Sequence, residues 1–149
     1  MSASPRNASR KPSAGDVYQA GTLSGNPLAV AAGRATLDQL DDAAYSRLAA
    51  LTDRLAGGLV EAAGDHPVTV TAVPGLVTPF FSAEPIEDFT DASACDLDAH
   101  ARFCRALLER GIYPPPSQFE AWFVSLAHDE AAIDHTCEAA AAAFEAAFS

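Results

Sequence analysis

The ten residues from Tyr18 to Pro27 have the chemistry best suited to binding an anion. They read Tyr-Gln-Ala-Gly-Thr-Leu-Ser-Gly-Asn-Pro, a run of backbone donors with two small hydroxyls. Gly21 lets a ligand approach the backbone closely, because it has no side chain. The string therefore predicts a phosphate site formed by backbone amides and the hydroxyl of Thr22 or Ser24.

The same string leads directly into a predicted helix. Asn26 suits the N-cap position, and Pro27 suits the first helical position, where an N–H would have no partner. Many helix starts have this composition and bind no ligand, so an ordinary helix-entry loop is the alternative interpretation. In either interpretation, we expect Ser24 and Asn26 to be caps more than ligands.

Other chemistry-bearing residues give weaker patterns. Glu120 follows Ser117-Gln118-Phe119 and precedes an apolar run, so it either projects into a cleft or is an ordinary exposed carboxylate. His100 and Cys104 have a spacing found in metal sites, but no Cys-x-x-Cys pair completes a ligand set. We therefore predict no metal, with Cys104 in the core and His100 at the surface. No hydroxyl or thiol lies in a recognisable nucleophile turn.

The composition is that of a globular protein with a single core. The chain has 149 residues, of which 49% are hydrophobic and 19% charged. A net charge of −11 disfavours binding to nucleic acid or to an anionic membrane. Three cysteines without close spacing, no long apolar run and no signal-peptide pattern indicate a cytoplasmic location.

Apolar spacing predicts the elements that position these residues. Helices are expected over 27–40, 42–63, 96–110 and 129–148, and strands over 68–73 and 76–82, with short candidates at 112–113 and 122–124. Pro79 predicts an edge or a bulge in its strand. The segment from 84 to 94 is expected to be irregular. In the third helix, we expect one face to line the core (Leu97, Ala101, Cys104 and Leu108).

This order of elements predicts an α+β fold, a small, mostly antiparallel sheet covered by helices on one face. Residues 1–15 are rich in Ser, Pro, Arg and Lys and lack apolar periodicity, which indicates a disordered tail. Residues 16–149 are expected to form the folded domain, with a loop and linking helix at 16–40 and an α+β sandwich at 41–149.

Several segments resemble the glutamate-1-semialdehyde 2,1-aminomutase family, which are pyridoxal-phosphate enzymes of the class III aminotransferase type. They are the string 18–27, Leu-Val-Thr-Pro-Phe-Phe at 76–81, Gly-Ile-Tyr at 111–113, Pro-Ser-Gln-Phe-Glu-Ala at 116–121 and Ser-Leu-Ala-His at 125–128. They occur in the family's order, and the match covers residue 16 to the end of the chain. The resemblance implies the C-terminal domain of fold-type I pyridoxal-phosphate enzymes.

The resemblance also implies roles for three residues. Thr22, with the backbone of Gly21 beside it, matches the hydroxyl that contacts the cofactor phosphate across a subunit boundary, which implies a homodimer. Glu120 matches a residue that faces the substrate. The family reaction converts glutamate-1-semialdehyde to 5-aminolevulinate, the tetrapyrrole precursor, with pyridoxal 5'-phosphate as cofactor.

The catalytic lysine of the family has no counterpart in the matching segments. Lys11 is the only lysine, and it lies in the predicted tail. A pyridoxal-phosphate enzyme of this type needs a lysine amine to bind the cofactor covalently and to transfer protons. We therefore assign no catalytic residue, and expect the isolated chain to bind no cofactor covalently and to turn over no substrate without a missing N-terminal half.

Two departures from the family lie near Glu120. Trp122 replaces the usual Gly, and Pro114-Pro115 replaces a Leu-Ala type of sequence. The bulky indole of Trp122 predicts a narrowed cleft or a repacked loop, and both departures are expected to change the geometry around Glu120. Three alternatives remain open: a fragment of another class III aminotransferase, a non-enzymatic dimerisation module that pairs with a lysine-containing chain, and a gene-calling fragment without a role. The helix over 27–40 is expected to pack on a large domain.

Overall fold

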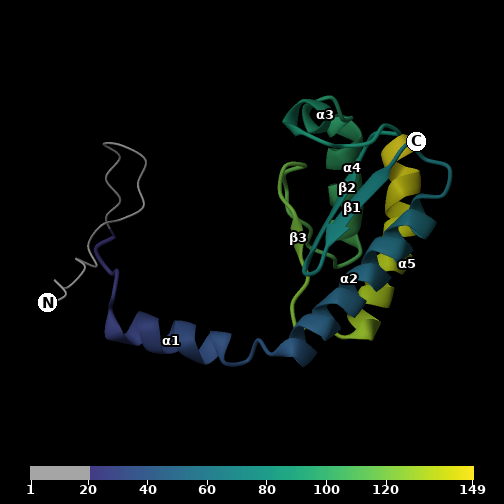
Figure 1. Cartoon of the computed structure of the whole chain (residues 1–149). Coiled ribbons are helices and arrows are strands. Elements are labelled where there is room, and N and C mark those ends of the chain that lie inside the picture. The colour runs from purple at the N-terminus through teal and green to yellow at the C-terminus, as the bar shows by residue number, and fades with distance from the viewer. Residues whose placement is uncertain (1–20) are drawn as a thin grey trace, which may run out of the picture. The chain divides into compact units, whose positions relative to one another are not determined.

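The computed structural model describes residues 21–149 and divides the chain into two units, Met1–Gln39 and Leu40–Ser149 (Figure 1). The predicted tail at 1–15 and Lys11 lie outside the described residues. The elements in chain order are α1 (Pro27–Leu37), α2 (Asp42–Ala63), β1 (Thr69–Val73), β2 (Leu76–Phe80), α3 (Phe89–Ser93), α4 (Leu97–Glu109), β3 (Trp122–Phe123) and α5 (Glu130–Phe148).

The sheet has the order β1-β2-β3, and both strand pairs are antiparallel. Strand residues alternate between its two faces. Val77 and Pro79 point into the core, whereas Thr71 and Thr78, which are direct partners across β1 and β2, point to the outer face. The predicted α+β fold with a small antiparallel sheet is confirmed.

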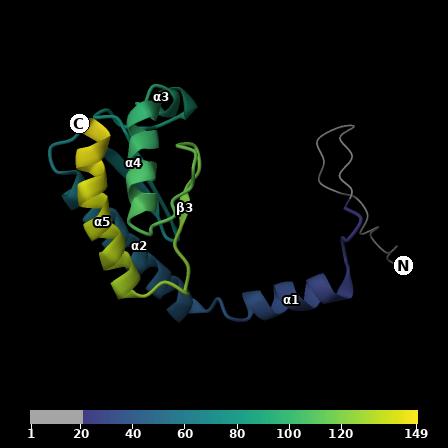
Figure 2. The same ribbon diagram turned by 180° about the vertical axis from the view of Figure 1, so that it is seen from behind.

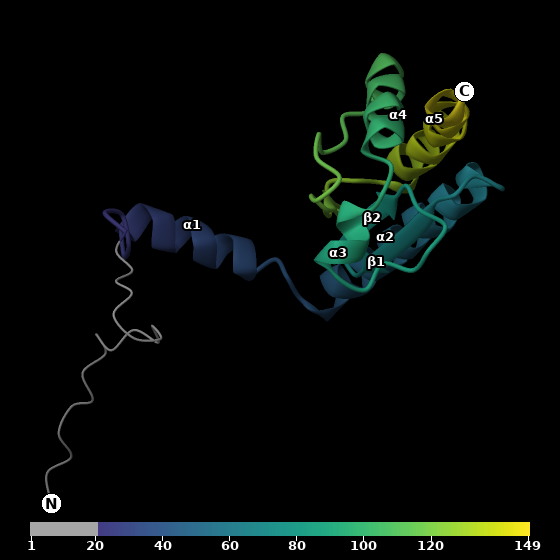
Figure 3. The same ribbon diagram turned by 90° about the horizontal axis from the view of Figure 1, so that it is seen from above.

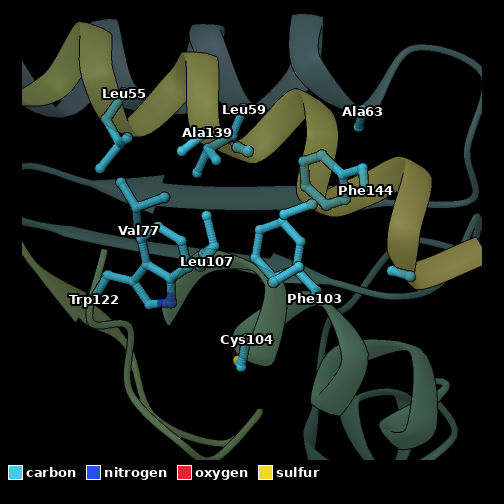
Figure 4. Packing of buried hydrophobic residues seen from close by; sticks show 14 of the residues in the cluster. Leu55, Leu59, Ala63, Val77, Phe103, Cys104, Leu107, Trp122, Ala139 and Phe144 are labelled. Carbon is cyan, nitrogen blue, oxygen red and sulfur yellow. The ribbon is translucent and has the colours of Figure 1, made fainter. Parts of the chain in front are cut away.

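Three helices form the core with the inner face of the sheet. α5 packs against both α2 and α4, and α2 also packs against β1 and β2. Figure 2 shows α4 and α5 in front of the strands, and Figure 3 shows the same two helices side by side from above. Phe103 of α4 stacks on Phe144 of α5 with a ring-centroid distance of 4.4 Å. Figure 4 shows the two rings side by side among the buried residues.

Of the two alternatives predicted for Pro79, an edge or a bulge, the structure has a local edge and no bulge. The β1–β2 register is continuous, and Pro79 lies opposite Val70 in the middle strand. In an antiparallel strand, the N and C=O of one residue point to the same neighbour. The Pro79 carbonyl points away from β1, toward Gln118, and β3 pairs only with Leu76 and Val77. The missing N–H of Pro79 therefore removes no bond between strands, because this end of β2 is a local edge.

The predicted core face of the third helix is wrong. Leu97 and Leu108 are 45% and 50% exposed. The buried residues of α4 lie on a face displaced around the helix and include Ala99, His100 and Phe103. The aromatic ring of Phe103 fits between α5 and the sheet, so its burial sets the rotation of the helix. Cys104 is buried as predicted.

Two local predictions fail because local sequence was ambiguous there. Ile112 and Tyr113 form no strand, since they follow a left-handed Gly111 and precede prolines. The segment expected to be irregular contains α3. Its start has a capping box, in which Asp88 accepts hydrogen bonds from the backbone of α3 and Asp91 accepts one from the backbone of Asp88.

The β1–β2 turn is attached to α2 and to the segment after β3. The Thr52 hydroxyl donates to the Leu48 carbonyl (2.6 Å) and accepts from the Gly75 N–H (2.9 Å). The Gly75 carbonyl accepts from the Val124 N–H at 2.9 Å. Gly75 has a φ of 90°, which favours glycine. Gly75 thus connects α2, the β1–β2 turn and the segment after β3.

We expect Thr52→Val to lower the free energy of unfolding by about 1–2 kcal/mol, because the Gly75 N–H loses its acceptor. Amide hydrogen exchange should show faster exchange at Gly75. Thr52→Ser is the matched control, because it keeps the hydroxyl. If Gly75 keeps its protection in Thr52→Val, the hydroxyl is not its partner in solution.

α2 and α5 approach closely at Gly58. A Cβ added there would overlap the Cys137 sulfur and lie 3.0 Å from the Cys137 Cβ, whereas a Cβ at Gly57 would meet no atom within 4 Å. Nearby, the Arg54 guanidinium holds the Asp134 carboxylate through two hydrogen bonds of 2.6 and 2.8 Å. Asp134 raises the pKa of Arg54, and Arg54 lowers the pKa of Asp134.

We expect Gly58→Ala to lower the free energy of unfolding by about 1–3 kcal/mol, because the added methyl forces α2 and α5 apart. Gly57→Ala should instead raise it by about 0.5–1 kcal/mol through helix propensity alone. Urea denaturation of both variants measures the difference. Equal shifts in the two variants would contradict the close contact.

Candidate functional site

The first predicted site residues lie in a turn before α1. Ser24 N–H donates to the Gly21 carbonyl, and Asn26 N–H donates to the Leu23 carbonyl, both at 3.0 Å. Gly25 has a φ of 78°, a left-handed conformation that suits glycine. Gly21 and Thr22 are exposed. A side chain at Gly21 would meet the Ser24 hydroxyl at 2.5 Å, so glycine allows the turn to close.

Asn26 caps the N-terminal end of α1. Its side-chain oxygen accepts from Leu28 N–H (3.0 Å) and Ala29 N–H (3.1 Å), and Pro27 has no N–H. The N-cap prediction for Asn26 is confirmed. The first-turn amides therefore already have an acceptor. The groups still able to bind an anion are the amide and the hydroxyl of Thr22 in the turn, which have no acceptor among residues 21–149.

Glu120 lies on the loop between α4 and β3. Its carboxylate is exposed, and no ion pair involves it among residues 21–149. The loop turns at Ser117, whose carbonyl accepts from Glu120 N–H at 3.1 Å and whose hydroxyl accepts from Phe119 N–H at 3.2 Å. Glu120 therefore lies in a turn with its side chain exposed. Thr22 and Glu120 belong to different units, each described by itself.

Gln118 fixes this loop to the sheet, a role that the sequence did not reveal. Its side chain is only 3% exposed, and its Nε2 donates to the Pro79 carbonyl at 2.9 Å. It thereby replaces the strand that is missing beside the end of β2. Its Oε1 is the one buried side-chain nitrogen or oxygen of the described residues without a hydrogen-bond partner. In the sequence, the only indication of this role was that Gln118 lies two residues before Glu120.

Trp122, for which a narrowed cleft or a repacked loop was expected, packs into the core. The indole is 9% exposed and stacks on Phe103 at a centroid distance of 6.3 Å. Because it is the β3 partner of Val77, it points to the inner face of the sheet. Trp122 is therefore a core residue.

His128 closes the turn that precedes α5. Its Nδ1 accepts from the Ser125 N–H at 3.0 Å, which places the proton of a neutral ring on Nε2. The Ser125 hydroxyl lies 3.1 Å from the same nitrogen. His128 therefore stabilises the turn through local contacts to Ser125.

His100 is buried, so its predicted surface position is wrong. Its ring is 6% exposed, packs edge-on against Phe81, and lies 3.4 Å from the Cys104 sulfur through Nε2. Burial lowers the pKa of His100 and raises the pKa of Cys104, so both groups are neutral near pH 7. A neutral imidazole and thiol form a core contact, not an activated nucleophile.

Residues 21–149 contain no cluster of three His, Cys, Asp or Glu side chains placed to bind a metal.

Comparison with known proteins gives the context for these residues. No protein-family model matches the chain. It is 52% identical over 133 residues to a glutamate-1-semialdehyde 2,1-aminomutase of Syntrophobacter fumaroxidans, covering 87% of this chain. It is 50% identical over 129 residues to the enzyme of that name from Desulfatibacillum aliphaticivorans, covering 85%. This chain resembles the C-terminal portion of a glutamate-1-semialdehyde 2,1-aminomutase.

The chain spans about a third of the length of these aminomutase relatives, 31% and 30% respectively. Solved structures with this fold also match the chain over about a third of their own length. An ω-transaminase from Sphaerobacter thermophilus has a TM-score of 0.75 at 23% identity, over 89% of this chain and 31% of its own. A β-phenylalanine aminotransferase from Variovorax paradoxus has a TM-score of 0.66 at 25% identity, over 88% and 31%. No helix within residues 21–149 combines the length and apolar content that crossing a bilayer needs.

We expect the free energy of unfolding to fall as the pH decreases from 7.5 to about 5.5. The lowered pKa of folded His100 means that the unfolded chain takes up this proton first, starting near its ordinary value of 6.5. The stability present above that pH is lost as the pH falls toward the pKa of the folded state. His100→Gln should flatten this slope, whereas His135→Gln, on the exposed side of α5, should keep it. Denaturant titrations across the range measure the slope. An unchanged slope in His100→Gln would contradict a buried neutral His100.

Proposed function

We propose that this chain supplies the C-terminal portion of a pyridoxal-phosphate aminomutase that converts glutamate-1-semialdehyde to 5-aminolevulinate in tetrapyrrole synthesis. The observation that supports this proposal most is the 52% identity over 133 residues to a relative of that name. The proposed cellular location is the cytoplasm, in keeping with three free cysteines. The proposed domain organisation is a loop and linking helix at 16–40, followed by a sandwich at 41–149.

The turn before α1 fits a phosphate through Gly21 and Thr22. The Thr22 amide and hydroxyl are exposed and have no acceptor among the described residues, and Gly21 lets the turn close against the Ser24 hydroxyl. Backbone amides and a hydroxyl are typical phosphate ligands. In this proposal, the contact is made to the cofactor of a neighbouring subunit in a homodimer. The exposed apolar side chains of α1, among them Leu28 and Leu37, support burial against a partner.

Glu120 is the proposed substrate-side residue. Its exposed carboxylate can accept hydrogen bonds from a substrate amino group, and the turn at Ser117 together with Gln118 fixes its backbone. When bound, pyridoxal phosphate supplies the electron-withdrawing ring that amino transfer requires. The covalent bond to the cofactor would come from a lysine outside residues 21–149, because this range contains none. We therefore propose that the chain has no aminomutase activity by itself.

Reconstitution tests this function. The Syntrophobacter fumaroxidans aminomutase without the residues that match this chain, here called the trimmed relative, is mixed with this chain, pyridoxal phosphate and glutamate-1-semialdehyde. We expect 5-aminolevulinate from the mixture and none from either protein alone. Glu120→Gln in the mixture should lower kcat by about tenfold or more. Glu138→Gln, an exposed carboxylate on α5, should leave kcat unchanged.

The matched residues of the relative, expressed separately, are the positive control. If they restore activity to the trimmed relative and this chain does not, the proposed function is wrong. If this chain forms 5-aminolevulinate unaided, the proposed dependence on a partner is wrong.

A second candidate function is that of an aminotransferase with another amino donor. It is favoured by the folds of the ω-transaminase and the β-phenylalanine aminotransferase. The two functions differ in their products, because an aminotransferase passes the amino group to a separate keto acid. Amino transfer to added pyruvate in the reconstituted mixture, without formation of 5-aminolevulinate, would identify this function.

A further inference from the structure

The pairing of β3 with β2 ends just before it would reach Glu120. The last pair joins Val77 of β2 to Trp122 of β3. In the same antiparallel register, Pro79 would lie opposite Glu120 two residues further on. β2 itself continues to Phe80, so the strand with which Glu120 could pair is present. Glu120 instead lies in a turn, although a strand partner is available.

A pair of Pro79 with Glu120 would be of the kind that exchanges two backbone hydrogen bonds. Such pairs alternate with non-bonded pairs along antiparallel strands. The Val124 N–H donates to the Gly75 carbonyl at 2.9 Å, so Gly75 and Val124 occupy a bonded position. Pro79 and Glu120 lie four residues from it in the same register and therefore occupy a bonded position too. Because proline has no N–H, only one of the two bonds could form there.

Gln118 occupies the acceptor that the remaining bond would use. Its Nε2 donates to the Pro79 carbonyl at 2.9 Å, and its side chain is only 3% exposed. The Glu120 N–H donates instead to the Ser117 carbonyl at 3.1 Å, which closes the turn. The side-chain amide of Gln118 thus substitutes for the backbone of a third-strand residue.

The same proline accounts for the unpaired oxygen of Gln118. Oε1 is fully buried and has no hydrogen-bond partner within residues 21–149. The N–H and C=O of a residue in an antiparallel strand point to the same neighbour, so an N–H at position 79 would point to the side where Gln118 lies. A side-chain amide offers both a donor and an acceptor. Pro79 uses the donor but has no N–H to give to the acceptor.

The early end of β3 decides where the Glu120 carboxylate lies. Residues directly opposite each other share a face of the sheet, and Val77, Pro79 and Trp122 all point to the inner face. Opposite Pro79, the Glu120 side chain would point into the same apolar core, where a carboxylate without a partner is strongly unfavourable. In the turn, this side chain is exposed.

We propose that Pro79 and Gln118 are positioning residues for Glu120: together they end β3 before residue 120 and turn its carboxylate out of the core, toward the substrate. This inference rests on the proposed function, in which Glu120 is the substrate-side residue. It adds the two residues that determine the direction of that side chain. Both act through Glu120 and not through contact with the substrate.

Nuclear magnetic resonance couplings across hydrogen bonds test these contacts in the isolated, isotope-labelled chain. In the wild type, we expect a coupling between Gln118 Nε2 and the Pro79 carbonyl carbon. Pro79→Val restores an N–H with a side chain of similar size, and we expect its nitrogen to couple with Gln118 Cδ, because Oε1 gains a donor. Coupling of this nitrogen to the Glu120 carbonyl carbon, or to neither group, would overturn the inference.

Kinetics in the mixture with the trimmed relative test the positioning. Gln118→Met keeps the length of the side chain and removes its amide, so we expect kcat to fall by about tenfold or more. In the Glu120→Gln background, the same substitution should lower kcat by no more than about twofold, because the effects of coupled residues are not additive. The matched control is Thr52→Val, which removes a hydrogen bond at the other end of the hairpin and should keep kcat within about twofold of the wild type. Circular dichroism verifies that the variants fold.

Two kinetic outcomes would overturn the inference and leave the proposed function intact. One is a kcat of Gln118→Met within about twofold of the wild type, and the other is an equal loss of kcat in the Glu120→Gln background. If Gln118→Met does not fold, Gln118→Leu takes its place, because it also removes the amide. If the wild-type chain restores no activity where the relative's own matched residues do, the proposed function is wrong, and the role of Glu120 fails with it.

Discussion

The aromatic layer between the sheet and two helices is the interaction on which the described fold depends. The ring of Phe81, the residue after β2, has centroid distances of 5.3 Å to Phe103 and 5.9 Å to Phe144, and those two rings stack on each other. Large aromatic side chains bury more apolar surface than other residues and constrain relative orientation through ring geometry. Because all three rings must fit between the sheet, α4 and α5, their packing sets the rotation of both helices.

This packing uses only one face of the sheet, and that asymmetry explains the surroundings of the candidate site. β3 begins at Trp122, which joins the aromatic layer, and the residues before it do not pair with the far end of β2. The open end of β2 is then completed by the amide of Gln118. The loop that carries Glu120 is thus held by a side chain where a longer strand would have used its backbone. Core packing and the exposure of Glu120 are consequences of the same arrangement.

Local signals predicted the elements well where their cause was local. Asp96 and Asp129 each accept from an amide three residues on, as their N-cap positions require. Gly64 ends α2, and its φ of 54° is one that glycine adopts readily. These features need only neighbouring residues, so their sequence pattern was sufficient. The family blocks were equally visible, because they are contiguous strings of characteristic residues.

By itself, the sequence determined the order and the limits of most elements, the α+β class, and the resemblance to the aminomutases. It could not determine the burial of His100, the inward position of Trp122 or the contact from Gln118 to Pro79, which spans 39 residues. Each of these depends on which face of an element meets a distant partner. Backbone propensity and capping act within a few residues, whereas side-chain burial is decided by the packing of segments far apart in the chain, and only the tertiary structure specifies that packing.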